Sequence, residues 1–159
     1  MANYIYPAPG VNATEATLSL EVNSDSSNDS LSVPSLQDIT VNASNDVFTW
    51  TQLDEGSKKQ IATTATNSLS MNLVLEQTSF FGDGSSSAGT ASLKGIFGMS
   101  SDKDLVEFSL YLGDQSDGTT GKTVSGTGYI TGLAPTVSAD APVWVTPITI
   151  TVDGDYTIA

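Results

Sequence analysis

Residues 68–76 read Ser68-Leu69-Ser70-Met71-Asn72-Leu73-Val74-Leu75-Glu76 and form the most informative stretch for the fold class. Successive side chains of a β-strand point to opposite faces of its sheet. The apolar residues that would share one face are Leu69, Met71, Leu73 and Leu75. The polar residues that would share the other face are Ser68, Ser70, Asn72 and Glu76. This pattern predicts a strand in an antiparallel sheet that is buried on one side and wet on the other.

Other stretches of the chain have similar strand character, and one has helical character. The further predicted strands are residues 17–22, 36–41, 47–53, 105–112, 124–131 and 143–152. Residues 42–46 are rich in Asn, Ser and Asp and predict a turn. Residues 88–99 predict one short helix, because Leu93, Ile96 and Phe97 fall at helical spacing. Pro147 lacks a backbone N–H and predicts an edge, a bulge or a switch between two sheets.

These elements predict a mainly β fold, either a β-sandwich or a partly closed barrel with one short helix. A chain of 159 residues suits one hydrophobic core, so residues 16–159 would form a single domain. Residues 1–15 contain Pro7, Pro9 and Gly10 and would form an extended N-terminal arm. The expected core is Leu18, Leu20, Leu73, Leu75, Phe97, Phe108, Leu110, Ile130, Ile148 and Ile150.

The charged residues are strongly unbalanced. Five Lys and no Arg stand against 18 Asp and Glu, which gives a formal net charge of −13. Such a charge opposes binding to nucleic acid backbones and to anionic membranes. No apolar run approaches the roughly 20 residues that span a bilayer, and residues 1–10 lack the features of a signal peptide. We therefore expect a protein that folds in a cytoplasm and does not enter a membrane.

Residues suited to catalysis are scarce. The chain has no His and no Cys, which removes the commonest general base and all thiolate ligands. No Ser lies in a G-x-S-x-G motif, and Lys58 and Lys59 lie in a charged stretch that we expect in solvent, where neither would activate a Ser. Acid pairs such as Asp114 and Asp117 indicate solvated loops rather than a glycosidase site. We expect no enzyme activity and no cofactor.

Calcium binding is the metal chemistry that the sequence leaves open. Oxygen-rich stretches occur at residues 23–29, 114–117 and 153–155. None of them matches the twelve-residue calcium loop with its closing Glu. We therefore name no metal-ligating residue.

From residue 68 to the C-terminus, the order of motifs resembles that of the tail tube proteins of long-tailed bacteriophages. The strand 68–75 is followed by an acidic, Gly-rich linker and the helix 88–99. The strand 105–112, the Gly- and aromatic-containing stretch 124–133 and the closing stretch 143–154 come next. The resemblance implies hexameric rings that stack into a tube, with the sheets of neighbouring subunits joined into an inner β-barrel.

The same resemblance implies a conduit for DNA ejection without catalytic residues. It implies three partners besides the chain itself, namely the tape measure, terminator and distal tail proteins. It also implies a place in the virion tail, with assembly in the host cytoplasm. DNA would pass through without specific binding, because a wall with surplus carboxylate and no Arg offers a polyanion little to hold.

Two groups of residues would carry this function. The candidate lumen-facing residues, from the polar faces of residues 68–76 or 124–131, are Ser68, Ser70, Asn72, Glu76, Ser125 and Thr127. The candidate subunit contacts, from the apolar part of the N-terminal arm and from the charged loop 54–59, are Tyr4, Ile5, Tyr6, Asp54, Glu55, Lys58 and Lys59. Long loops often carry contacts, and adjacent lysines would suit an acidic neighbour.

Two other non-enzymatic functions fit the same composition. A capsid decoration protein or other virion surface protein would also be β-rich and acidic. An immunoglobulin-like adhesion module stabilised by calcium would use the oxygen-rich loops, and calcium would then raise its melting temperature.

Overall fold

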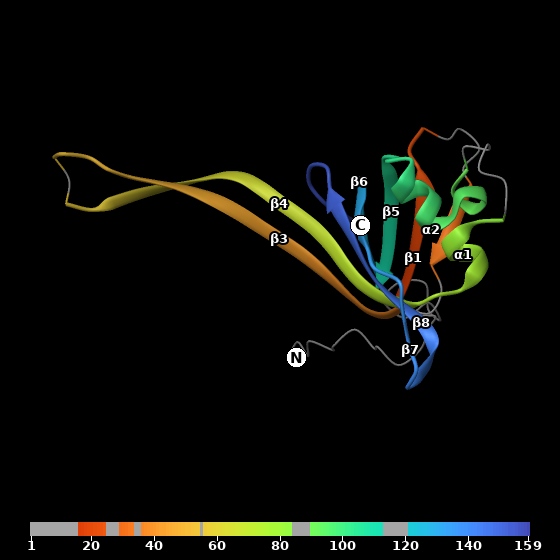
Figure 1. The fold of residues 1–159 in the computed structure, drawn as a ribbon. Helices are drawn as coiled ribbons and strands as arrows, with labels where there is room; N and C mark the ends of the chain where they lie inside the picture. The colour runs from red at the N-terminus through yellow and green to blue at the C-terminus, as the bar shows by residue number, and fades with distance from the viewer. Residues whose placement is uncertain (1–15, 25–28, 34–35, 55, 84–89, 113–120) are drawn as a thin grey trace, which may run out of the picture.

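The computed structural model describes residues 16–24, 29–33, 36–54, 56–83, 90–112 and 121–159. The predicted N-terminal arm, with Tyr4, Ile5 and Tyr6, and also Glu55 lie outside the described residues. The described part confirms the mainly β fold: nine antiparallel strands form one sheet that is accompanied by two helices (Figure 1).

The sheet follows the order β2-β1-β5-β6-β8-β4-β3, with β7 added to β8 and β9 added to β6. Among the described strands, β2 and β3 are the ends of this path and do not pair with each other, so the sheet stays open. The nine strands thus form one open sheet rather than two sheets packed as a sandwich. The elements in chain order are β1 (Ala16–Val22), β2 (Ser30–Val33), β3 (Leu36–Thr51), β4 (Lys58–Val74), α1 (Gln77–Phe81), α2 (Ala91–Ser101), β5 (Val106–Leu112), β6 (Lys122–Leu133), β7 (Thr136–Ser138), β8 (Ala141–Val152) and β9 (Thr157–Ile158).

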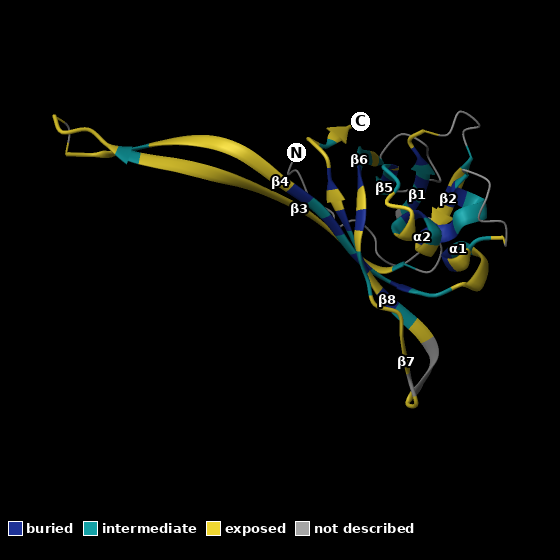
Figure 2. Cartoon of the chain, turned by 45° about the horizontal axis from the view of Figure 1, so that its top comes forward, coloured by how far each residue is buried: buried dark blue, intermediate teal, exposed yellow. Residues whose placement is uncertain are grey.

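The hydrophobic core lies between one face of the sheet and the two helices (Figure 2). The expected core residues that the structure buries are Leu18, Leu20, Leu73, Phe108, Leu110, Ile130, Ile148 and Ile150. Leu75 is partly buried and packs against this core. Phe97 was expected in the core, but its side chain is 49% exposed. The reason is a break in α2 at Gly95 (φ 67°, ψ 177°), after which Ile96 and Met99 take the buried positions.

The first half of the sheet is longer than predicted. Residues 36–41 and 47–53 were expected to be two strands with a turn at 42–46. Instead, a single strand, β3, runs continuously from Leu36 to Thr51. Its partner β4 begins at Lys58 rather than near Ser68, and together they form a hairpin that projects far from the rest of the molecule (Figure 1). The turn-forming residues fit a strand here because their side chains are exposed. Asp46 sits at a β-bulge, where its backbone carbonyl and carboxylate accept hydrogen bonds from the hydroxyls of Thr63 and Thr64.

The described part of the chain contains two helices, where the sequence predicted one. The predicted helix 88–99 corresponds to α2, and α1 was not predicted because it has only five residues. The helices cross closely at two glycines with positive φ, Gly82 and Gly95. A Cβ atom added at Gly95 would lie 2.3 Å from the backbone nitrogen of Gly82, so only glycine permits this contact.

Pro147 lies where β8 changes partners on one side. The register with β6 ends at Ile148, opposite Leu133, and the register with β7 includes Val145, opposite Thr136. On its other side, Pro147 is opposite Asn72 of β4. A residue without a backbone N–H therefore occupies the gap between two ladders.

Candidate assembly surfaces

The side of the sheet opposite the core is polar across neighbouring strands. Ser109 of β5 lies opposite both Ser19 of β1 and Ser125 of β6. Thr151 of β8 lies opposite both Tyr129 of β6 and Ser68 of β4. Residues directly opposite in an antiparallel pair share one face of the sheet. We call this surface the polar face; its residues are Thr17, Ser19, Glu21, Ser68, Ser70, Asn72, Glu107, Ser109, Tyr111, Thr123, Ser125, Thr127, Tyr129, Thr149 and Thr151.

The polar face unites five of the six candidate lumen-facing residues. The sequence offered the polar faces of residues 68–76 and 124–131 as alternative lumen-facing surfaces. Because β4 and β6 both pair with β8, these two polar faces lie on one surface of the sheet. The five residues are Ser68, Ser70 and Asn72 on β4 and Ser125 and Thr127 on β6.

Glu76, the sixth candidate, lies outside the polar face. β4 ends at Val74, and Glu76 is the N-cap of α1. Its carboxylate accepts hydrogen bonds from the Ser79 hydroxyl at 2.6 Å, from the Ser79 backbone N–H at 2.9 Å and from the Thr78 backbone N–H at 3.3 Å. These bonds, with the Ser79 hydroxyl first, lower the pKa of Glu76 to about 2. Alternation in the sequence alone does not distinguish the last strand position from such a cap.

The polar face satisfies many of its groups internally and carries little charge. The amide of Asn72 donates to both carboxylate oxygens of Asp38 at 3.0 Å, and the hydroxyls of Thr131 and Thr151 lie 2.9 Å apart. Glu21 lies opposite Glu107. None of the polar-face residues defined above is a lysine. The polar face is therefore a surface of hydroxyls and amides with a small negative charge.

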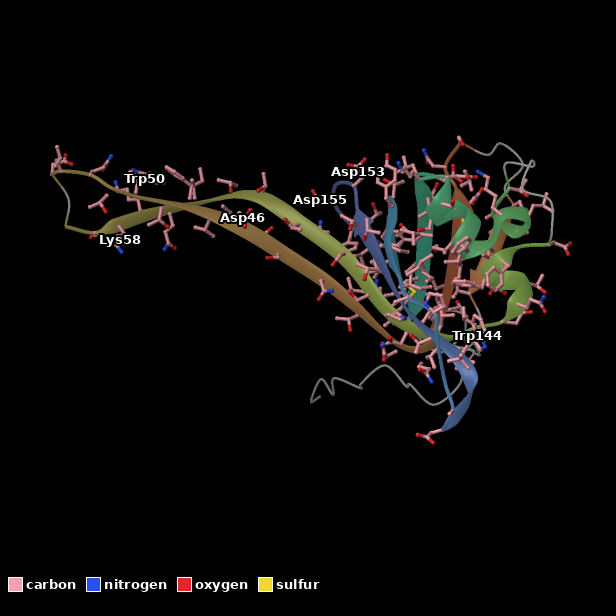
Figure 3. All side chains as sticks on the ribbon, viewed as in Figure 1. Asp46, Trp50, Lys58, Trp144, Asp153 and Asp155 are labelled. Carbon is pink, nitrogen blue, oxygen red and sulfur yellow. The ribbon has the colours of Figure 1, made fainter. Side chains whose placement is uncertain are left out.

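The hairpin of β3 and β4 forms a second distinctive surface. We call residues 43–67 the arm and the other described residues the body. The described side chains from residue 43 to residue 66 are exposed, apart from the half-buried Trp50 and Lys59. The arm extends to one side of the body, with Trp50 and Lys58 in its outer part (Figure 3).

The candidate contact residues of the loop 54–59 lie at the end of the arm. Asp54 lies in the turn, and Lys58 and Lys59 open β4 opposite Thr51 and Trp50. The expected charged loop is thus the tip of a projecting hairpin. The sequence did not predict this extension, because exposed polar strands lack the apolar alternation that reveals a buried face.

Long strand edges in this hairpin have no partner in the described part of the chain. β3 pairs with β4 alone, along residues 36–51. β8 pairs with β4 only at residues 68–74, so residues 58–67 of β4 pair on one side, with β3. Open edges present rows of N–H and C=O groups to which another strand can add.

The C-terminal segment fastens the base of the arm. The Tyr156 hydroxyl lies 2.7 Å from the carbonyl oxygen of Asn42 and 2.8 Å from that of Ser68, and its single hydrogen serves one of them at a time. Asn67, which is 5% exposed, donates its amide to the carbonyl oxygen of Gly154 at 2.8 Å. The Tyr156 ring packs edge-on against Phe108, and burial raises the pKa of the hydroxyl. No pattern in the sequence indicated these contacts.

The oxygen-rich stretch 23–29 has a structural role at its described end, whereas the stretch 114–117 lies outside the described residues. Asp29, at the end of stretch 23–29, accepts hydrogen bonds from the backbone N–H and the hydroxyl of Ser92 at the start of α2. The Ser92 hydroxyl is the main cause of the lowered pKa of Asp29. Among the described residues, no three acidic side chains converge to hold a metal ion. None of the helices described in the structure is long and apolar enough to cross a bilayer.

Comparison with known proteins gives matches of structure but not of sequence. No protein-family model matches the chain, and no curated protein matches it significantly. A chain in the tail of an empty gene transfer agent (GTA) particle, refined with C6 symmetry, superposes with a TM-score of 0.63 at 13% identity, over 89% of this chain and 95% of that one. A chain in the sheath/tube terminator structure of an extracellular contractile injection system, PVC, superposes with a TM-score of 0.61 at 14% identity, over 97% of both chains.

The tube-terminating cap of the anti-feeding prophage gives a similar result. One of its chains superposes with a TM-score of 0.57 at 14% identity, over 100% of this chain and 95% of that one. The chain therefore has the fold of proteins from phage-like tails and contractile injection particles, as the resemblance in the sequence predicted.

Proposed function

We propose, from this shared fold, that the chain is a structural subunit of a tail tube, which forms hexameric rings that stack around a central channel. The observation that carries the proposal is the polar face. Five strands of the body contribute to this continuous surface, which is rich in hydroxyls and contains no lysine. A monomer needs only a wet outer surface, which commonly mixes both signs of charge. A surface without cations suits a channel wall.

The channel would conduct DNA during ejection. Cationic groups that contact phosphates release counterions and hold the polyanion. Ser, Thr and Asn side chains, together with the carboxylates of Glu21 and Glu107, offer no such contact. DNA would therefore move through the tube without specific binding.

The open edges and the arm would supply the contacts between subunits. An edge as long as β3 is an aggregation hazard unless another strand or chain covers it, and a neighbouring copy in the ring would do so. The tip of the arm, with Asp54, Glu55, Lys58 and Lys59, would contact a subunit of an adjacent ring. The N-terminal residues Tyr4, Ile5 and Tyr6 would form a further contact.

This function requires partners but no catalysis. The chain would be non-enzymatic, would bind no cofactor, and would join tape measure, terminator and distal tail proteins in the virion tail after assembly in the host cytoplasm. Structural neighbours from a sheath/tube terminator, a tube-terminating cap and a baseplate support such a setting.

Electron microscopy of the purified protein over a range of concentrations tests the proposal. We expect sixfold rings and tubes with the polar face inward. A protein that remains monomeric at high concentration, or a channel lined by the lysines of the chain, would overturn it. Closed trimers instead of stacked rings would favour a decoration protein.

A further inference from the structure

The outer part of the arm carries an exposed aromatic surface. Phe48 lies opposite Ile61, and Trp50 lies opposite Lys59, so the four side chains share one side of the hairpin. The rings of Phe48 and Trp50 stack at 6.0 Å. Phe48 is 60% exposed and Ile61 is 56% exposed. We call these four residues the arm patch.

The arm patch is not needed to hold the hairpin to the body. The same alternate positions of β3 carry Asp38, Thr40 and Asn42 near the body, and they change to Phe48 and Trp50 only in the outer part. A solvated hairpin would keep polar residues there, as it does near its base. Large apolar side chains that cluster on an exposed element typically mark an interaction site.

A second aromatic surface lies on the helices. Phe81 of α1 is 51% exposed and Phe97 of α2 is 49% exposed, with their ring centres 6.0 Å apart. Both rings contact the buried ring of Phe80, at 4.8 and 6.0 Å between centres. The close contact of Gly82 with Gly95 fixes the two helices relative to each other. We call Phe81 and Phe97 the helix patch, and it is a preorganised apolar surface.

The two patches lie at opposite ends of the molecule. The arm extends away from one side of the body, while α1 and α2 cover the other (Figures 1 and 2). The arm therefore cannot cover the helix patch of its own chain. Two complementary surfaces at opposite ends of one chain produce a head-to-tail contact that repeats without limit or closes only by symmetry.

We propose that the arm patch of one copy docks on the helix patch of another copy. This inference rests on the proposed tube function and adds to it the surface that receives the arm. Apolar side chains on both partners would leave water together on docking. The contact would be heterologous, as stacking in one direction requires.

Charge favours a second copy as the occupant. Lys59 lies within the arm patch. The residues from 76 to 104, which contain the helix patch, carry Glu76, Asp83, Asp102 and Asp104 against Lys94 and Lys103, so two lysines minus four acids give −2. Asp83 is exposed and follows Phe81 by two residues. A lysine beside the aromatic rings would thus approach an acidic border.

Cysteine cross-linking tests this contact with little background, since the chain contains no cysteine. Ile61→Cys would be introduced into one batch of protein and Phe97→Cys into another, and the two would be mixed, assembled and treated with a short bifunctional maleimide. We expect at least tenfold more cross-linked dimer than with either batch alone. Lys59→Cys would replace Ile61→Cys if the latter impairs assembly.

Two matched controls define the site. Gln60→Cys lies on the opposite side of the arm from Ile61, and Trp144→Cys replaces an aromatic side chain that is similarly exposed, at 48%, on the β7–β8 hairpin. Gln60→Cys should not cross-link efficiently with Phe97→Cys, and Trp144→Cys should not cross-link efficiently with Ile61→Cys. The inference would be overturned if, in assembled tubes, Ile61→Cys cross-links to Trp144→Cys, to a second Ile61→Cys or to a Tyr4→Cys variant and does not cross-link to Phe97→Cys. The proposed tube function would still stand in that case. Failure of the wild-type protein to assemble would overturn both.

Discussion

The hydroxyl oxygen of Tyr156 lies 2.8 Å from the carbonyl oxygen of Ser68, and this contact joins the C-terminal segment to the point where the arm leaves the body. Among the residues of β4 that pair with β8, Ser68 is the one nearest the arm. Beyond it, β4 pairs only with β3 in the described part of the chain. Tyr156 therefore fixes the base of the arm at the place where support from the sheet ends.

Tyr156→Phe should destabilise the body slightly and loosen the base of the arm. The change removes one hydrogen bond to a backbone carbonyl, and the expected loss is about 1 kcal/mol in the free energy of unfolding. Denaturant unfolding gives this value, and hydrogen exchange should show faster opening of the amides near Asn67. An unchanged exchange rate there would contradict the assigned role.

The contribution of the Tyr156 hydroxyl should depend on pH in the alkaline range. Burial raises the pKa of the group in the folded state, so its stabilising effect is complete below the unfolded-state pKa near 10 and is lost as the pH rises through the folded-state pKa. The stability difference between the wild type and Tyr156→Phe should therefore shrink above pH 10.

Asp29→Ala should destabilise α2. Asp29 bonds to the backbone N–H and the hydroxyl of Ser92, and removal of such a cap costs about 1 kcal/mol. The lowered pKa means that the carboxylate stabilises the fold above its unfolded-state pKa and stops doing so as the pH falls through the folded-state value. Urea unfolding at neutral and acidic pH should show the difference between variant and wild type only at neutral pH. Asp54→Ala, in the exposed hairpin turn, is the control and should change little.

Gly95→Ala should be among the most damaging substitutions of a single small residue. Its backbone (φ 67°, ψ 177°) is a conformation that is essentially restricted to glycine. A Cβ atom would also lie 2.6 Å from the carbonyl oxygen of Phe80, so we expect a loss of at least about 2 kcal/mol. Gly56→Ala, where no atom beyond the adjacent residues lies within 4 Å of the new Cβ, should stay within about 0.5 kcal/mol. Thermal unfolding of the two variants would compare them directly.

Shortening the arm should separate folding from assembly. Asn45 pairs with Ala65, so a two-residue Asn-Gly turn between them would close the hairpin near its base. Those of the removed side chains that the structure describes are exposed or, for Trp50 and Lys59, half-buried within the arm. We expect a melting temperature within about 4 °C of the wild type and no tubes in electron micrographs. Normal tubes would show that the arm is dispensable for stacking.

A lysine on the polar face should make the assembled protein retain DNA. Ser125→Lys places a cation on the proposed channel wall, where it would contact phosphates and release counterions. Binding of short duplexes to assembled tubes should appear at low salt and disappear as salt is raised. Ser101→Lys, at the exposed end of α2, adds the same charge away from the polar face and should bind far less. Equal retention by both variants would argue against an inward polar face.

The sequence predicted best where structure depends on local alternation. Leu69, Met71 and Leu73 are buried and Ser68, Ser70 and Asn72 share the opposite face, because a period of two residues fixes the face of each side chain. The polar face as a whole could not be predicted, since it depends on the register that sets β6 and β4 on either side of β8.

The errors arose where a tertiary contact overrides a local signal. Residues 42–46 have turn composition, yet pairing with residues such as Asn67 and Ser68 holds them in a strand. Phe97 has helical spacing from Leu93, but the backbone of Gly95 interrupts the helix and leaves Phe97 exposed. Tyr156 bonds to a residue 88 positions away, and nothing in its neighbourhood in the sequence signals such a bond.

The pairing of β1 with β5 sets the order in which the chain can acquire its structure during synthesis. Leu18 lies opposite Leu110, so 110 − 18 = 92 residues must follow Leu18 out of the ribosome before the two strands can meet. Until then, the β1–β2 hairpin lacks its central neighbour, and a hairpin alone is at best marginally stable in water. Pairings so distant along the chain slow folding. A nascent subunit should therefore gain its core, and its ability to join other copies, only after β5 has left the ribosome and can pair with β1.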